Sequence, residues 1–430
     1  MTEELQTYDV VVIGGGAAGI MAALEAAASG ASVALLEKSE RLGKKILISG
    51  GGKCNITNVE VTLDNYHGRH PRFAQDVLNA FDQHALRAWL ASIGLETVVD
   101  EEKGKVWPAS MTSKSVMAAF SAELEHRGVA VFLGCAVRDL SRGAANELSR
   151  GESMFDIASG NGHRFKSRAV VLATGGLAAP QLGADASGLR IAEALGHHLE
   201  PQYPALVGIR TADVWGHGLA GLTCEDAEIV LEIDGREVLS VTGSLLFTHY
   251  GLSSPAIFRL SREVDPALDA GQKVRLLVNF RADEFHSAED ANTEVRRALG
   301  ADTRKELGTV MAYVVRYRRL ADELSKLVGA DPAKRVREIQ KPQRDELERL
   351  VYRCPFTVTG TLGWARAEVM RGGVDVRKID PRTMESKLVP GLFICGEMLD
   401  IDGDVGGYSF QFAFASGKAA GAAAAKTLQR

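Results

Sequence analysis

Residues 8–19 read YDVVVIGGGAAG, and this stretch decides the fold. Its apolar, β-branched first half predicts a buried strand, and the small residues at 17–29 predict a helix directly after it. The turn between them has the G-x-G-x-x-G spacing, formed by Gly14, Gly16 and Gly19. These glycines permit a tight bend, close approach of a pyrophosphate to the backbone and close packing of helix on strand. The stretch therefore predicts a dinucleotide site at a helix N-terminus.

An acidic residue at the end of the next strand supports this prediction. Residues 32–36 predict a second buried strand, and Glu37 follows it directly. A carboxylate at this spacing binds the ribose 2′-hydroxyl of a dinucleotide. The acid favours a nucleotide without a 2′-phosphate.

The composition is that of an ordinary globular protein. The chain has 430 residues, of which 46% are hydrophobic and 24% are charged, and its net charge of −5 argues against an unspecific nucleic-acid binder. Five scattered cysteines without a C-x-x-C pair favour a reducing compartment, with no disulfide framework and no metal site. The N-terminus lacks a signal-peptide pattern, and the apolar run 10–28 fits strand–turn–helix better than a membrane span. We expect a cytoplasmic protein without membrane contact.

The order of patterns along the chain predicts an interrupted domain. Strand and helix patterns, including helices at 71–94 and 113–127, alternate up to about residue 195. Antiparallel-type strands follow at 227–233, 237–241 and 273–279, and then come charged helices over 283–350. A short apolar strand at 391–395 and a helix of small residues resume the first pattern. A nucleotide-binding domain split by an insertion explains this order.

Four glycine-bearing segments each follow or adjoin a predicted strand of the split domain. They are 14–19, 49–55, 173–176 and 402–410. In a doubly wound sheet such loops gather at the carboxyl ends of the strands, where ligands bind. One of them alone is as readily a simple turn. Together the four predict one ligand site.

Segments spread from end to end of the chain also carry a family resemblance. They are GGGAAG (14–19), GKKILISGGGKCNITN (43–58), ATGGLAAPQLGADASG (173–188), LLFTHYGLSSPAI (245–257) and the C-terminal segment 372–417. With them the chain resembles the YhiN/BaiN-type flavoproteins, a family of FAD-dependent oxidoreductases also labelled aminoacetone oxidases. SGGGKCN and TMESK are specific to that family. Lys45 and Lys53 stand where arginine is frequent, and Ser409 where asparagine is usual, so bidentate contacts are lost while charge or polarity is kept.

The resemblance implies a fold and a cofactor. We expect a three-layer α/β, Rossmann-like FAD-binding domain from residues 1–195 and 355–430. An inserted substrate domain, 196–354, then comprises a β-barrel-like part (196–282) and a helical subdomain (283–354). The cofactor is FAD rather than NAD. Because the chain has one dinucleotide fingerprint and no C-x-x-x-x-C pair, NAD(P)H must dock transiently, or electrons come from a substrate or a carrier protein.

The resemblance also implies the FAD contacts. Glu397 stands where flavoproteins hold the ribityl chain, Val137 where the backbone meets the adenine, and the helix starting near Gly406 points its N–H groups at the flavin pyrimidine edge, where they stabilise negative charge. The full expected set is Gly14, Gly16, Ala17, Ala18, Gly19, Glu37, Lys38, Lys45, Gly51, Gly52, Lys53, Cys54, Val137, Ala173, Thr174, Gly175, Gly396, Glu397, Asp404, Gly407, Tyr408 and Ser409.

Two residues are candidates for proton transfer. Cys54 lies in the loop that the resemblance places beside the isoalloxazine ring, and its thiol could donate a proton while flavin N5 delivers hydride. A small residue packed under the loop is the alternative role, since free cysteines are commonly buried. His249, in the insertion, could face the flavin or be structural. Lys53 is a candidate flavin or phosphate contact, and Tyr408 could stack near the ring.

The helical part of the insertion is basic. Residues 291–349 hold 14 Lys and Arg against 10 Asp and Glu, and the bias centres on KRVREIQKPQR at 334–344. Such a run is either a solvated helix face or a contact surface for RNA phosphates. In the second case the contacts are Lys334, Arg335, Arg337, Lys341 and Arg344.

The resemblance points to reduction of a polarised carbon–carbon double bond. It suggests two substrates: the 5,6-double bond of uridine in large-subunit ribosomal RNA, which the basic run favours, and a small enone such as a 3-oxo-bile acid. A flavin oxidase of a small amine and a non-catalytic ribosome-associated flavoprotein are further alternatives. Oxygen consumption distinguishes the first of these, and a flavin that NAD(P)H cannot bleach distinguishes the second.

Overall fold

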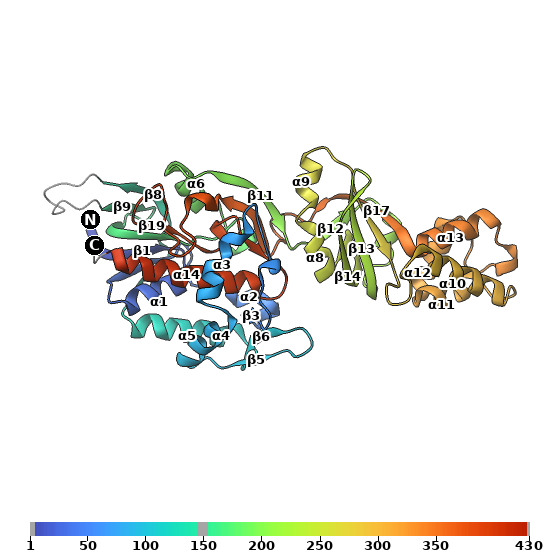
Figure 1. Cartoon of the computed structure of the whole chain (residues 1–430), viewed down its shortest axis with the longest axis horizontal. Helices are drawn as coiled ribbons and strands as arrows, with labels where there is room; N and C mark the ends of the chain where they lie inside the picture. The colour runs from blue at the N-terminus through green and yellow to red at the C-terminus, as the bar shows by residue number, and fades with distance from the viewer. Residues whose placement is uncertain (1–4, 144–153, 428–430) are drawn as a thin grey trace. The chain divides into compact units, whose positions relative to one another are not determined.

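The chain forms two compact units (Figure 1). The computed structural model describes residues 5–143 and 154–427. Unit 1 takes the described residues up to Tyr203 and from Val369 onward, and unit 2 spans Pro204–Glu368. Both boundaries lie further along the chain than 195 and 355. The reasons are that β11 (Leu199–Ala205) pairs with β18 (Val369–Val374), and that β17 (Cys354–Thr361) belongs to a barrel in unit 2.

A mostly parallel sheet organises unit 1. Its strands in order are β7 (Ala130–Phe132), β2 (Val33–Leu36), β1 (Leu5–Ile13), β10 (Arg164–Leu172), β9 (Phe155–Ser159) and β8 (Val137–Arg142), and β19 (Leu392–Ile394) also pairs with β10. Among the described residues of this sheet, the pairings of β8 with β9 and of β9 with β10 are antiparallel and the others are parallel. Val10, Val11 and Val12 are fully buried, as expected of a parallel strand covered on both faces.

The first and last helices of unit 1 pack directly on each other (Figure 1). They are α1 (Ala17–Ala28) and α14 (Tyr408–Lys426). A Cβ atom at Gly417 or Gly421 of α14 would lie 2.2 Å from the carbonyl oxygen of Ala18 or Ala22, respectively. The two glycines therefore allow backbone-to-backbone contact, which brings the C-terminal segment back to the dinucleotide-binding turn.

The remaining elements of unit 1 confirm one predicted helix and correct another. α5 (Ser113–His126) matches the prediction for 113–127. The helix predicted over 71–94 is wrong, because the chain leaves helical geometry at Phe81 and Asp82 caps a new helix by accepting from the Ala85 N–H at 2.8 Å. That region contains η2 (Pro71–Ala74), α3 (Gln75–Ala80) and α4 (Gln83–Ser92). The other elements are α2 (Lys44–Gly52), β3 (Thr57–Asn58), η1 (Leu63–Asn65), β4 (Tyr66–His67), β5 (Thr97–Val99), β6 (Lys105–Pro108), η4 (Pro180–Leu182), α6 (Ser187–Ala194), η6 (Val376–Lys378), η7 (Gly396–Met398) and β20 (Asp402–Gly403).

Unit 2 combines a closed barrel with a helical subdomain. The barrel runs β12 (Ile209–Thr211), β15 (Gly251–Ser253), β14 (Arg236–Thr248), β13 (Thr223–Ile233), β16 (Val274–Asn279), β17, with α7 (Val214–His217), α8 (Pro255–Ser261) and α9 (Val264–Asp269) around it. The subdomain contains α10 (Ala288–Ala301), α11 (Leu307–Val315), α12 (Arg318–Leu327), η5 (Val336–Glu338) and α13 (Lys341–Arg353). One hydrophobic core runs through both parts. The expected fold class, a Rossmann-like α/β domain interrupted by a barrel-like and helical insertion, is confirmed.

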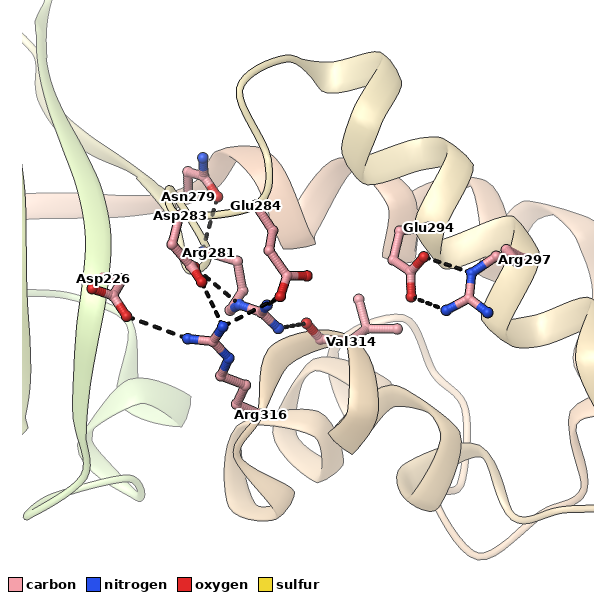
Figure 2. A network of polar contacts seen from close by, with 9 residues as sticks. All are labelled: Asp226, Asn279, Arg281, Asp283, Glu284, Glu294, Arg297, Val314 and Arg316. Carbon is pink, nitrogen blue, oxygen red and sulfur yellow. Dashed lines mark hydrogen bonds and ion pairs between the residues drawn. The ribbon is translucent and has the colours of Figure 1, made fainter.

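A polar network also ties the barrel to the helices (Figure 2). The buried Arg281 donates to the Val314 carbonyl at 2.9 Å and pairs with Asp283 and Glu284. Arg316, between α11 and α12, pairs with Asp283 at 2.5 Å and with Asp226 of β13 at 3.3 Å. The helical subdomain is thus held to the barrel by charge as well as by apolar contact.

In the described part of the chain, no helix is both long and apolar enough to cross a membrane.

Candidate functional site

The dinucleotide-binding turn has the geometry that its glycines predict. A Cβ at Gly14, where φ is +112°, would lie 2.4 Å from the Ala173 carbonyl oxygen, and one at Gly19 would lie 1.8 Å from the Gly14 carbonyl oxygen. These two glycines allow strand, turn and helix to pack tightly. Gly16 differs, because its Cβ direction is open for 4 Å and it caps the N-terminus of α1. The open side lies where N–H groups and the helix dipole favour a phosphate.

Glu37 closes the nucleotide end of the site. Its two carboxylate oxygens accept hydrogen bonds from the N–H groups of Gly15 and Ser39, each at 2.7 Å. A carboxylate has about four acceptor positions, so two remain open to further donors. The segment that precedes Val137 lies beside Glu37, since the Cys135 N–H donates to the backbone carbonyl of Glu37 at 2.9 Å. Lys38 pairs with Asp185 at 2.6 Å.

The other end of the site brings three distant segments together around Glu397. Its carboxylate accepts from Lys45 Nζ at 2.7 Å and from the Met370 N–H at 3.0 Å. A Cβ at Gly175 would lie 3.8 Å from the same carboxylate, and one at Gly396 would lie 2.8 Å from the Ala18 Cβ. The expected contacts at 17–18, 45, 173–175 and 396–397 are therefore neighbours in space.

The glycine-rich loop and the C-terminal segment also meet. A Cβ at Gly407 would lie 2.7 Å from the Thr57 carbonyl carbon, and Asn58 Nδ2 donates to the Gly406 carbonyl at 3.3 Å. Gly407 caps α14 in a left-handed conformation, with φ of +98°. Tyr408 therefore begins the helix whose N-terminus adjoins β3, the strand that follows Lys53 and Cys54 in the chain.

Unsatisfied polar atoms and free space in these segments fit a large polar ligand. Three side-chain oxygens, Asn55 Oδ1, Thr174 Oγ1 and Ser409 Oγ, are buried without a hydrogen-bond partner among the described residues. Each such atom costs about 1–3 kcal/mol unless a partner satisfies it. The Cβ directions of Gly51 and Gly52 are open for 4 Å. A bound FAD would supply both the missing partners and the missing volume.

Cys54 is a buried, neutral thiol. Its side chain is 1% exposed, its φ is +65°, and its N–H donates to the Ser49 carbonyl at 3.0 Å. Burial raises the pKa of the thiol to about 11, although a hydrogen bond with Ser49 lowers it in part. Cys54 therefore holds its proton at pH 7, as an acid must. The adjacent Lys53 is exposed.

Two residues that the sequence did not indicate lie beside the C-terminal glycine-bearing segment 402–410. His67 Nε2 lies 2.9 Å from Asp404 Oδ1, and the Tyr66 hydroxyl donates to the Tyr408 carbonyl at 3.0 Å. Both follow from the pairing of β4 with β20, which joins segments more than 300 positions apart. No local pattern in the sequence signals that pairing.

The remaining predicted residues lie in unit 2. His249 is exposed in the turn between β14 and β15, with its ring edge against Tyr250 at a centroid distance of 5.2 Å. Cys54 and His249 thus belong to different units. Lys334, Arg335, Arg337 and Lys341 are exposed. Arg344 departs from the expectation for the basic run, because its guanidinium donates to the Ile339 and Val336 carbonyls at 3.2 and 3.1 Å.

Comparison with known proteins identifies the family. Residues 8–423 match the family described as HI0933-like protein Rossmann domain. The chain belongs to this family. A 3-dehydro-bile acid delta(4,6)-reductase of Clostridium scindens is 35% identical over 420 residues, covering 96% of this chain and 98% of its own. Ribosomal RNA dihydrouridine synthases of Haemophilus influenzae and Escherichia coli are 29% and 30% identical, each covering 96% of this chain and 97% and 96% of their own.

Family and site geometry together confirm the resemblance to the YhiN/BaiN-type flavoproteins. This HI0933-like protein is an FAD-dependent oxidoreductase with FAD as its cofactor. Among the described residues, no group of three or more His, Cys, Asp or Glu side chains is placed to hold a metal ion.

Proposed function

We propose that this HI0933-like protein reduces the 5,6-double bond of uridine in large-subunit ribosomal RNA. Two relatives that match nearly its whole length are ribosomal RNA dihydrouridine synthases. The observation that carries the choice is the basic run of unit 2. Lys334, Arg335, Arg337 and Lys341 are exposed and have no acidic partner in the described structure. Four such cations suit a polyanion such as RNA better than a small enone such as a 3-oxo-bile acid with its single carboxylate.

The chemistry needs a hydride at one carbon and a proton at the other. Reduced FAD, when bound, would supply the hydride for the β-carbon of the conjugated double bond. Cys54 is our candidate for the proton at the α-carbon, since burial keeps its thiol neutral and its loop adjoins the flavin-binding segment. Lys45 and Glu397 hold each other in place and would hold the ribityl chain of FAD, and the N–H groups at the start of α14 would stabilise negative charge on the reduced flavin. His249 is the second candidate donor, and NAD(P)H is the proposed reductant.

A small enone is the second candidate substrate. The bile-acid reductase is more similar to this chain, at 35% identity, than either RNA-modifying relative. A 3-oxo-bile acid presents the same kind of acceptor, a double bond conjugated to a carbonyl. The two candidates therefore share the FAD site and differ in what unit 2 must recognise.

We also propose a cytoplasmic location. All five cysteines are free and buried, as in proteins of a reducing compartment.

The decisive experiment is nucleoside mass spectrometry of ribosomal RNA from a strain lacking the gene. We expect dihydrouridine to disappear from the large-subunit RNA and to return when the gene is restored. Unchanged dihydrouridine would overturn the RNA substrate. Turnover of a 3-oxo-enone by the purified holoenzyme would then support the second candidate, and peroxide release with a small amine would point to an oxidase.

A further inference from the structure

The helical subdomain presents an exposed surface that two distant segments build together. Residues 303–307 pair in antiparallel fashion with 334–337: the Leu307 N–H donates to the Lys334 carbonyl at 2.8 Å, and the Val336 N–H donates to the Lys305 carbonyl at 3.0 Å. Lys305 is therefore a neighbour of the basic run. We name this the Tyr313 surface, and it consists of Lys305, Tyr313, Lys334, Arg335 and Arg337.

The cations of this surface differ from the paired cations of the subdomain. Lys305, Lys334, Arg335 and Arg337 are all exposed, and within the described residues none of them pairs with an acid. By contrast, Arg297, Lys326 and Arg349 pair with Glu294, Glu323 and Glu346 at 2.5–2.7 Å.

The acids near the Tyr313 surface are few. Glu306 lies opposite Arg335, but its carboxylate pairs with Arg318 at 3.6 Å. Asp302 pairs with Arg304 at 3.4 Å, which leaves two exposed acids, Asp331 just before the run and Glu338 within it, against four cations. The surface therefore has uncompensated positive charge, which suits a polyanion.

An exposed aromatic ring adds a second, independent feature. Tyr313 on α11 is 74% exposed, an unusual state for a side chain of this size. Tyr313 lies one helical turn after Thr309, whose hydroxyl accepts a hydrogen bond from Arg318 Nη1 at 2.9 Å. Arg318 also pairs with the carboxylate of Glu306, the residue opposite Arg335. The ring thus lies on the helix whose first residue, Leu307, pairs with Lys334 of the basic run.

We infer that the Tyr313 surface binds an unpaired stretch of RNA, with Tyr313 stacking on a base and the cations contacting phosphates. Exposed aromatic rings among basic side chains are the means by which proteins hold single strands, because each base offers a face for stacking. A duplex keeps its bases stacked and offers only phosphates. The inference rests on the proposed RNA substrate, and the bound stretch flanks the target instead of containing the uridine that is reduced.

The test measures binding alone, with the full-length, FAD-loaded protein. The probes are a labelled single-stranded oligouridine and a blunt-ended RNA duplex of similar length, and their binding is measured by fluorescence anisotropy over a range of salt concentrations. We expect Tyr313→Ala to raise the Kd for oligouridine about tenfold and to leave duplex binding nearly unchanged. Tyr313→Phe keeps the ring and should bind like the parent.

Charge neutralisation supplies the second arm. The triple variant Lys334→Gln, Arg335→Gln, Arg337→Gln should weaken both probes and lower the salt slope for oligouridine by about 2, at about 0.7 per lost phosphate contact. The matched control Arg297→Gln, Lys326→Gln, Arg349→Gln removes the same charge from paired cations and should change Kd little. Parental binding by Tyr313→Ala, or equal weakening by both triples, would overturn the inference.

The two proposals fail separately. Loss of the proposed function appears as unchanged ribosomal dihydrouridine in the deletion strain, whatever the protein binds. Failure of the Tyr313 surface appears as oligouridine binding that is indifferent to Tyr313, even where dihydrouridine is lost.

Discussion

The Cys54 thiol is a buried acid that keeps its proton at neutral pH. The side chain is buried, and burial raises the pKa of the thiol to about 11. A donor with this pKa is fully protonated below it and loses its proton as the pH rises through it. Substrate reduction that depends on Cys54 should therefore be level between about pH 6 and pH 9 and fall at higher pH.

Replacing this thiol separates its chemical role from its packing role. We expect Cys54→Ala to slow substrate reduction about 10²-fold or more, while FAD binding and flavin reduction by NAD(P)H stay nearly intact. Alanine meets the same strain as cysteine at φ +65°, so the backbone should not change. Stopped-flow absorbance of the flavin measures both half-reactions. Cys224→Ala, another buried cysteine but in the barrel, is the control. Unchanged turnover would make Cys54 a packing residue.

For single residues, the sequence allows the role to be predicted where that role depends on neighbours in the chain. Gly14, Gly16 and Gly19 have such roles, and the structure gives each the surroundings expected of it. The His67–Asp404 pair depends on a pairing between distant segments and has no local signal. Arg344 could not be separated from the rest of its run either, because only the folded loop brings the Val336 and Ile339 carbonyls to its guanidinium.

Among the elements, the contact between α1 and α14 depends on glycine at two positions of α14. In an exposed helix Gly→Ala is stabilising, yet at Gly421 the new Cβ would lie 2.2 Å from the Ala22 carbonyl oxygen. We expect Gly421→Ala to destabilise unit 1 by roughly 1–3 kcal/mol and to lower the temperature of flavin release by roughly 5 °C. Flavin fluorescence during heating measures it. Gly300→Ala, in α10 with nothing within 4 Å, should leave flavin release unchanged.

Helices and strands were predictable where the hydrophobic pattern and the signals for the ends of the element agree. The strand 8–13 and the helix 113–127 have a clear period and clear ends, and both were found. The helix predicted over 71–94 failed because its apolar period continues across Phe81 while the Asp82 cap restarts the backbone. A capping residue inside a continuous apolar pattern gives only a weak signal in the sequence, but in the structure it sets where the new helix begins.

For the whole molecule, the boundaries of the insertion were harder to place than its existence. The change from alternating to antiparallel pattern near residue 200 indicates an insertion, but the pattern of β17 alone does not say which sheet it joins. In the structure β17 pairs with β12 and β16 and so closes the barrel of unit 2. Strand pairing is set by three-dimensional packing, so the sequence-based prediction wrongly assigned this strand to the FAD-binding domain.

The division into two units predicts a selective effect of the cofactor on unfolding. All the expected FAD contacts lie in unit 1, and unit 2 has a hydrophobic core within its own residues. Free FAD at about 100 times its Kd adds about 2.7 kcal/mol to the free energy of unfolding of the unit that binds it. In scanning calorimetry we therefore expect excess FAD to raise one unfolding transition and to leave the other in place.

Gly16→Val is the control that ties this shift to the dinucleotide-binding turn. Position 16 has φ of −85° and free space on its Cβ side, so valine should not disturb the fold of the protein without cofactor. The same side chain would occupy the space into which the pyrophosphate must fit. The variant should show both transitions at their cofactor-free temperatures whether or not FAD is added. A shift of both transitions in the parent, or a surviving shift in Gly16→Val, would show that the cofactor binds elsewhere than at the turn formed by residues 14–19.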